Sequence, residues 1–173
     1  MAARCKIMNG FEGDEHQDQA LAIKEDDEGM STVSVQSDNH APLTLEGSVV
    51  RLEPIRRDHA ELFWEIAKDD LEDIFRWIPY SMRTREDFRK LVDKVFEEQQ
   101  RGESVAFATV DRSSARTLGS TRFMNIDRTN RRVEIGSTWI APLWQRTAVN
   151  TEAKFLMLRH AFETWQCIRV ELK

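Results

Sequence analysis

A strand that leads through a polar loop into an apolar helix constrains this fold more than any other feature of the chain. The residue pattern predicts the strand at positions 132–140 and the helix at 150–166. A second strand is expected at 168–172. Since a strand, a helix and a strand in succession form a crossover, the two strands should pair in parallel, with the helix lying across the sheet. The polar residues of this helix are spaced for one strip: Glu152, Arg159, Glu163 and Gln166.

The segments before this crossover alternate between strand and helix patterns. Thr84 and Asp87 supply a helix start signal, an apolar stripe follows at helical spacing, and Gly102 ends that helix. Asp58 and Glu61 indicate a second capping box. Strands are expected at 49–52, 105–110 and 118–126, and a short helical piece at 71–77. Because short polar connections join the strands between 105 and 140, an antiparallel meander is predicted.

Charge divides the chain near Pro42. The first 42 residues carry nine acidic and three basic side chains and few large apolar ones, so we expect a disordered acidic tail there. Residues 43–173 are nearly neutral and form the expected domain, without the basic excess of a nucleic-acid-binding protein. Cys5 and Cys167 have neither disulfide nor metal-ligand spacing. Without a signal-peptide or membrane-span pattern, the sequence is interpreted as that of an intracellular soluble protein.

The polar loop that opens the last helix is a candidate phosphate site. The first amides of a helix have no partner within it, and the helix dipole adds partial positive charge there. Each charge-assisted hydrogen bond contributes roughly 1.5–3 kcal/mol, so three or four amides would hold a pyrophosphate firmly. An ordinary strand-to-helix connection explains the same spacing, and the loop alone does not decide between the two.

Three motifs carry a family resemblance: LEGSVVRLEP at 45–54, VEIG at 133–136 and QRTAVNTEA at 145–153. Together with the predicted order of elements, they make residues 43–173 resemble the GNAT acetyltransferases, and within them the RimJ/RimL-like branch. The resemblance implies an α/β fold with a mixed, mostly antiparallel central sheet flanked by helices. It also implies acetyl transfer from acetyl-CoA, which in this branch goes to protein N-termini and some small amines.

The resemblance further implies where coenzyme A binds. A loop whose amides grip the pyrophosphate would run into the helix through Gln145, Arg146, Thr147, Ala148, Val149, Asn150 and Thr151. The strand end that pairs with the pantetheine arm would be Trp139, Ile140 and Ala141. Ala148 and Asn150 stand where the family usually has glycine. Asn150 tolerates left-handed backbone angles, whereas a positive φ at Ala148 would cost about 1–2 kcal/mol, so either its φ is negative or binding is weakened.

The chain ends earlier than the resemblance predicts. Family members continue through another helix and two strands, which complete the sheet and supply part of the coenzyme site, and these C-terminal strands are missing after Lys173. The sequence is therefore expected to be a fragment or a truncated product. Residues 168–172 have the pattern of a strand meant to be buried on both faces. Without the strands that would follow it, we expect an unpaired apolar edge that favours self-association and leaves activity weak or absent.

Glu134 is the candidate catalytic residue. Acetyl transfer needs a neutral amine, and a carboxylate on the central strand can accept its proton directly or through a water. Strand alternation places Glu134, Gly136 and Thr138 on one face, and Gly136 leaves room beside the carboxylate. A solvated or ion-paired glutamate near Arg131 and Arg132 explains the same residue equally well, since charged strand residues usually face water. Thr138 either lines the pocket or packs against its neighbours.

Several other side chains have competing interpretations. The aromatic residues before the long third helix either form a wall over the acceptor or pack in the core: Trp64, Phe75, Trp77 and Tyr80. Arg146 either contacts a phosphate or is solvated. His160, among apolar neighbours, is expected to be packed rather than to act as a base, and His59 is expected at the surface.

These interpretations predict an acetyl-CoA-dependent N-acetyltransferase that uses acetyl-CoA as a co-substrate and needs no metal. The expected partners are acetyl-CoA and a primary amine, either a protein or peptide N-terminus or a small amine. Neither nucleic acid nor membrane is expected, and the expected location is cytoplasmic. The alternative is an inactive fragment that only binds coenzyme A or associates with partners. Acceptor identity and oligomeric state do not follow from the sequence.

Overall fold

In the part of the chain that the structure describes, six strands form one sheet whose spatial order follows the chain, β1-β2-β3-β4-β5-β6. The computed structural model describes residues 43–78 and 80–173, so the predicted acidic tail at 1–42 lies outside the described residues. The strands are β1 (Leu45–Glu46), β2 (Val50–Pro54), β3 (Val105–Asp111), β4 (Thr117–Asp127), β5 (Arg132–Ile140) and β6 (Arg169–Leu172). All neighbours are antiparallel except β5 and β6, which are parallel, so the predicted meander and crossover are confirmed.

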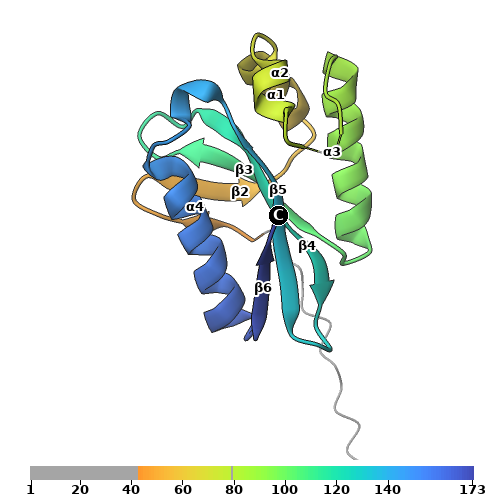
Figure 1. Ribbon diagram of the computed structural model, residues 1–173, viewed down its shortest axis with the longest axis vertical. Helices are drawn as coiled ribbons and strands as arrows, with labels where there is room; N and C mark the ends of the chain where they lie inside the picture. Colours follow the sequence, from red (N-terminus) through yellow and green to blue (C-terminus); the bar gives the residue numbers. More distant parts are fainter. Residues whose placement is uncertain (1–42, 79) are drawn as a thin grey trace, which may run out of the picture. The chain divides into compact units, whose positions relative to one another are not determined.

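Helices cover both faces of this sheet (Figure 1). Those on one face pack against β3 and β5: α1 (His59–Ala67), α2 (Leu71–Phe75) and α3 (Arg85–Gln100). On the other face, α4 (Ala148–Arg159) packs against β2 and the centre of the sheet. A 3-10 turn at Pro142–Trp144 precedes α4, and a π-helical turn at His160–Thr164 continues it. The α/β fold class with a mostly antiparallel, helix-flanked sheet is confirmed.

Helix starts follow the sequence signals in one case and depart from them in another. Thr84 and Asp87 form the predicted capping box, in which each side chain accepts the other's backbone N–H, at 3.2 and 2.8 Å. The prediction of a capping box at Asp58 is wrong, because Asp58 has helical angles and its carboxylate accepts from the Arg56 guanidinium.

The surface position predicted for His59 is also wrong. Its ring is fully buried, and its Nδ1 accepts from the Arg56 N–H at 2.8 Å.

A bulge in β5 changes which side chains share a face. Between two neighbouring pairs with β4, β5 has one residue more than its partner, and Ser137 there has a φ of +48°. Such a bulge reverses the alternation of the side chains beyond it. Because Ile135 packs under α4, Glu134 and Gly136 face the layer of α1 and α3, whereas Thr138 faces α4. The prediction that Thr138 shares a face with Glu134 is therefore wrong.

β6 is an exposed edge strand. In the described part of the chain it pairs only with β5, and Ile168 and Leu172 are 69% and 63% exposed. The expected unpaired edge is present in the described residues, and Val170 alone of the strand is partly buried, against the α4 side of the sheet.

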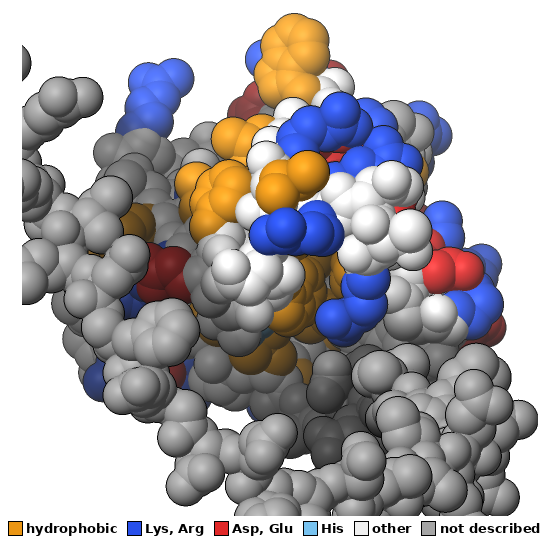
Figure 2. All heavy atoms as spheres, turned by 90° about the horizontal axis from the view of Figure 1, so that it is seen from below, with side chains coloured by type: hydrophobic (Ala, Val, Ile, Leu, Met, Phe, Trp, Pro, Cys, Tyr) orange, Lys and Arg blue, Asp and Glu red, His pale blue; other side chains and the backbone are white. Residues whose placement is uncertain are grey.

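Arginines gather where the β4–β5 hairpin meets the start of β6. Arg132 and Arg169 are opposite each other in the backbone register of β5 and β6, and the Arg131 guanidinium donates to the Gln166 carbonyl. Figure 2 views the domain from below and shows Lys and Arg side chains on this face. Since β5 runs away from this end, α4 begins at the opposite end of the strand.

Candidate active site

β5 loses its outer neighbour halfway along its length. β6 pairs with Arg132–Ile135, and the Lys173 N–H then donates to the Ile135 carbonyl at 3.1 Å. Beyond this point no strand of the described residues pairs with the outer edge of residues 136–140, although the inner edge stays paired with β4. The outer edge therefore presents backbone N–H and C=O groups to which an extended ligand can bond. Trp139, Ile140 and Ala141, expected at the pantetheine arm, lie at its end.

The loop that follows is fixed to this strand end and then opens α4. The Gln145 side chain donates to the Ile140 carbonyl at 2.9 Å. Thr147 is the N-cap, because its Oγ1 accepts from the Val149 N–H at 3.3 Å while donating to the Trp144 carbonyl at 2.7 Å. The other amides of the first turn have no partner within the helix. Free amides and the positive end of the helix dipole thus meet the end of the unpaired edge.

The backbone conformation of this loop shows whether glycine is needed at positions 148 and 150. Ala148 is the first residue of α4 and is not left-handed, so the strain considered for it does not arise. Asn150 lies in the first turn of the same helix. The left-handed residue is Arg146, with a φ of +58°, which costs a residue with a side chain roughly 1–2 kcal/mol. Its side chain is exposed, so both interpretations of Arg146 stay open.

Glu152 anchors α4 to the turn between β1 and β2. Its carboxylate accepts from the Ser48 N–H (2.8 Å) and Oγ–H (2.6 Å), the Val49 N–H (2.6 Å) and the Val50 N–H (2.7 Å). Burial acts to raise the pKa of Glu152, but these donors outweigh it and lower the pKa to about 2. A Cβ at Gly47 would come within 2.4 Å of this carboxyl group. Glu152 is thus a tertiary contact rather than a member of a polar strip.

Glu134 lies just before the bulge, with 7% of its side chain exposed. Its Oε2 accepts from the Asn125 side-chain amide at 2.9 Å and is 3.7 Å from the Lys173 ammonium. Its Oε1 is buried and has no hydrogen-bond partner in the described part of the chain. A Cβ at Gly136 would lie 3.4 Å from this oxygen, so the expected room beside the carboxylate is present. Glu134 is therefore not solvated; it is ion-paired with Lys173 rather than with the neighbouring arginines, and its Oε1 is free to bond another group.

Lys154 on α4 is a candidate that sequence reasoning missed. Its ammonium donates to Thr138 Oγ1 at 2.5 Å and to Thr121 Oγ1 at 3.1 Å. Burial lowers the pKa of Lys154 to about 8. The apolar pattern of this helix gives no signal for Lys154, which stands two positions after Glu152 in the sequence. Residues two apart in a helix point about 200° apart, which puts these charges on opposite flanks.

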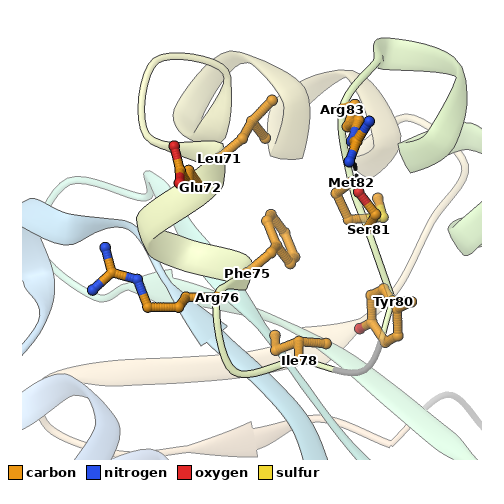
Figure 3. A pocket seen from close by; sticks show the side chains of 9 residues that line it. All are labelled: Leu71, Glu72, Phe75, Arg76, Ile78, Tyr80, Ser81, Met82 and Arg83. Atoms are coloured by element: carbon orange, nitrogen blue, oxygen red, sulfur yellow. Dashed lines mark hydrogen bonds between the residues drawn. The ribbon is translucent and has the colours of Figure 1, made fainter.

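A hollow of about 800 Å³ lies beside α2. Its apolar lining comes from α2 and the loop after it (Figure 3): Leu71, Phe75, Ile78, Tyr80 and Met82. Arg76 and Arg83 also line it, and Arg83 donates to Ser81 Oγ at 2.9 Å. The Phe75 ring is 5.5 Å from that of Trp139, and Tyr80 also lines a small crevice with Ser137. The hollow therefore adjoins β5 next to the bulge.

The four aromatic residues considered for a wall over the acceptor lie in different places. Phe75 and Tyr80 line the hollow, but Trp64 packs in the core and Trp77 is 88% exposed on the surface. His160 is packed as predicted, between two aromatic rings, and burial lowers its pKa.

Comparisons with known proteins agree with this geometry. The family model described as acetyltransferase (GNAT) domain matches residues 50–173. A GCN5-related N-acetyltransferase from Brucella melitensis is 29% identical, covering 75% of this chain and 59% of its own, with a TM-score of 0.68. An acetyltransferase (GNAT family) from Bacillus anthracis is 19% identical (74% and 71% covered, TM-score 0.62). RimL, a ribosomal L7/L12 alpha-N-protein acetyltransferase, is 16% identical (77% and 72% covered, TM-score 0.64). The last two show likeness of fold alone.

Further findings concern the extent of these similarities and the presence of membrane spans or metal sites. None of the curated proteins matches this sequence. The chain spans 59% of the length of the B. melitensis protein. Among residues 43–78 and 80–173, no helix has the length and apolar character to cross a membrane. The same residues contain no group of three or more His, Cys, Asp or Glu side chains placed to hold a metal ion.

Proposed function

Because this chain belongs to the GNAT acetyltransferase family, we propose that it transfers an acetyl group from acetyl-CoA to a primary amine. In this reaction the amine nitrogen bonds to the acetyl carbon and the carbon–sulfur bond breaks. One proton leaves the amine, and one reaches the departing thiolate. The observation that carries the proposal is the unpaired edge of β5, which ends at the free amides of α4.

The described residues fit acetyl-CoA as a substrate. The pantetheine arm carries amides that bond to an extended backbone, and residues 136–140 offer an edge beside which the described residues place no strand. The diphosphate suits the start of α4, where amides converge with the helix dipole. Trp139, Ile140 and Ala141 contribute backbone groups, since their side chains are buried. When bound, acetyl-CoA supplies the activated acyl group.

Glu134 is the proposed proton acceptor for the amine. Its buried Oε1 has no partner in the described part of the chain, and Gly136 leaves space beside it. Asn125 holds the other oxygen at 2.9 Å, which fixes the direction of the carboxylate. A positioned carboxylate of this kind contributes about 10²- to 10⁴-fold to the rate.

The hollow beside α2 is the proposed approach for the acceptor. Its volume of about 800 Å³ lies within the usual range of ligand sites, and Tyr80 leads from it to the bulge of β5. Its apolar residues suit an amine attached to an apolar side chain, and Glu72, Arg76 and Arg83 line the same hollow. The opening admits a peptide N-terminus, which we propose as the acceptor, and also a small amine, which is the alternative.

An assay with acetyl-CoA against mixed peptides and mixed small amines tests this proposal. Mass spectrometry should find an amine product heavier by one acetyl group, together with free thiol, and the product identifies the acceptor class. Binding of acetyl-CoA without product would favour the inactive, coenzyme-binding alternative. Absence of both binding and product would contradict the proposed function.

A further inference from the structure

The outer edge of β6 presents backbone groups and exposed apolar side chains. In the part of the chain that the structure describes, β6 has a neighbour on one side only, which is β5 (Figure 1). The Lys173 N–H donates to the Ile135 carbonyl on that side. Because successive residues of a strand direct their backbone groups to opposite sides, those of Val170 and Leu172 face outwards. The side chains of Ile168 and Leu172 are 69% and 63% exposed, so this edge can accept another strand.

The charged residues of β6 lie opposite like charges on β5. Arg169 is opposite Arg132, and Glu171 is opposite Glu134. Like charges in directly opposite positions of neighbouring strands are destabilising. Arg169 and Glu171 pair instead with each other along β6, at 2.6 Å, and both side chains are at least half exposed. Such an exposed pair contributes little to stability, so both groups remain available for opposite charges on the outer side.

The order of residues in β6 is complementary to itself when two copies run antiparallel. With Val170 opposite Val170 of the partner subunit, Arg169 is opposite the partner's Glu171, and Glu171 is opposite the partner's Arg169. Ile168 is then opposite the partner's Leu172, so the exposed apolar residues also meet.

The direction of the backbone groups agrees with this register. The outward N–H and C=O of Val170 make the central pair a hydrogen-bonded one. Residues 169 and 171 then belong to non-hydrogen-bonded pairs, in which opposite side chains approach each other most closely. Two pairs of opposite charges would therefore lie side by side across the interface.

We propose that a second copy of this chain binds the outer edge of β6, so that the two β6 strands pair antiparallel about a twofold axis at Val170. The interface is isologous, as in most homodimers, and it joins the two sheets into one. Other registers are less complementary. A register centred on Glu171 would place two glutamates opposite each other, and one centred on Leu172 would leave Arg169 outside the paired residues. This inference concerns association and does not depend on the proposed function.

Charge reversal tests the register, because the twofold axis makes each substitution act twice. In Arg169→Glu or Glu171→Arg, two pairs of like charges would face each other across the interface. Each variant should therefore raise the dimer Kd of residues 1–173 by at least about tenfold, measured by sedimentation equilibrium. Lys90→Glu, a charge reversal on the exposed face of α3, should leave the Kd unchanged. A wild-type chain that stays monomeric, or equal Kd values in all these proteins, would overturn the proposal.

Mixing the two variants gives the sharper test. In an equimolar mixture of Arg169→Glu and Glu171→Arg, every reversed charge faces an opposite one, so a heterodimer should form with a Kd close to that of the wild-type dimer. Its formation would also show that both variants are folded. Circular dichroism of each variant alone should match that of wild type, because both side chains are exposed. A mixture of folded variants that associates no better than either one alone would contradict the register.

Hydrogen exchange separates pairing at this edge from association through another surface. The amides of Val170 and Leu172 should exchange more slowly as the protein concentration rises, because the second copy supplies their acceptors. The amides of β1, at the opposite edge of the sheet, are the control and should not change. Protection of Val170 and Leu172 that is independent of concentration would indicate a different occupant of the edge. Protection that appears at β1 instead would place the interface elsewhere, and either result would overturn the proposal.

Discussion

Two carboxylates of the β5–α4–β6 crossover, the buried Glu134 and the half-buried Glu152, illustrate different uses of charge. Glu152 accepts four hydrogen bonds from three consecutive residues of the β1–β2 turn, and both of its oxygens are occupied. Glu134 accepts one hydrogen bond, from Asn125, and its Oε1 has no partner among the described residues. Glu152 therefore holds the helix in place, whereas Glu134 retains capacity for a further partner.

The same contrast separates the two flanks of α4. On one flank, both carboxylate oxygens of Glu152 accept hydrogen bonds from backbone amides. On the other flank, the Lys154 ammonium donates to two hydroxyl groups. A charge that is partly removed from water is costly while its hydrogen bonding is incomplete. The complete contacts of Glu152 should therefore control stability, and the incomplete ones of Glu134 should control catalysis.

Glu134→Gln should give the largest effect. The amide cannot accept the amine proton, so kcat should fall by about 10²- to 10⁴-fold with little change in acetyl-CoA affinity. Steady-state kinetics over a range of pH values would measure this. A variant with the wild-type pH–rate profile would show that Glu134 is not the proton acceptor.

Glu152→Ala should affect stability instead. Removing the carboxylate leaves three backbone amides of the β1–β2 turn without their acceptor, and water can reach only part of them. We expect a loss of about 3 kcal/mol in the free energy of unfolding, measured by urea denaturation. Glu134→Gln serves as the matched buried carboxylate, with an expected change below about 1 kcal/mol. Equal losses of unfolding free energy in Glu152→Ala and Glu134→Gln would contradict the different roles assigned to the two carboxylates.

The pH dependence of stability should carry the signature of Glu152. Its pKa is lowered from 4.5 to about 2 in the folded chain. The ionised carboxylate therefore stabilises the fold fully above the unfolded pKa, and this contribution is lost as pH falls from about 4.5 to about 2. The stability difference between wild type and Glu152→Gln should be constant near neutral pH and shrink over that interval. A difference that does not vary with pH would contradict the assignment.

Ala148→Pro should give the smallest effect, confined to coenzyme binding. Proline is favoured at the first position of a helix, and Thr147 already has extended backbone angles. The change removes one amide donor and should weaken acetyl-CoA binding about tenfold, without loss of stability. Ala148→Ser, which keeps the N–H, is the control. Val149 is less suitable for such a replacement, because its side chain is 1% exposed and Thr147 already accepts its N–H.

The sequence predicted the framework of this site better than its details. The span of β5 and the parallel pairing of β6 follow from local patterns, and the capping box at Thr84 is a local interaction. The bulge is different, since Ser137 has no left-handed preference and its φ is imposed by pairing with β4.

Tertiary contacts decided the remaining details. Glu152 and Lys154 could be placed only once β1–β2 and β5 were known to lie on opposite flanks of α4. The free Oε1 of Glu134 likewise depends on Asn125, which β4 brings to β5.

An NMR titration of the backbone amides with acetyl-CoA tests the central claim most directly. If the unpaired edge and the start of α4 form the coenzyme site, the amides of residues 136–141 and 147–151 should shift first and at the same ligand concentration. The β1–β2 turn that binds Glu152 should stay unchanged until higher concentrations. Early shifts confined to another region, with residues 136–151 unaffected, would contradict the account.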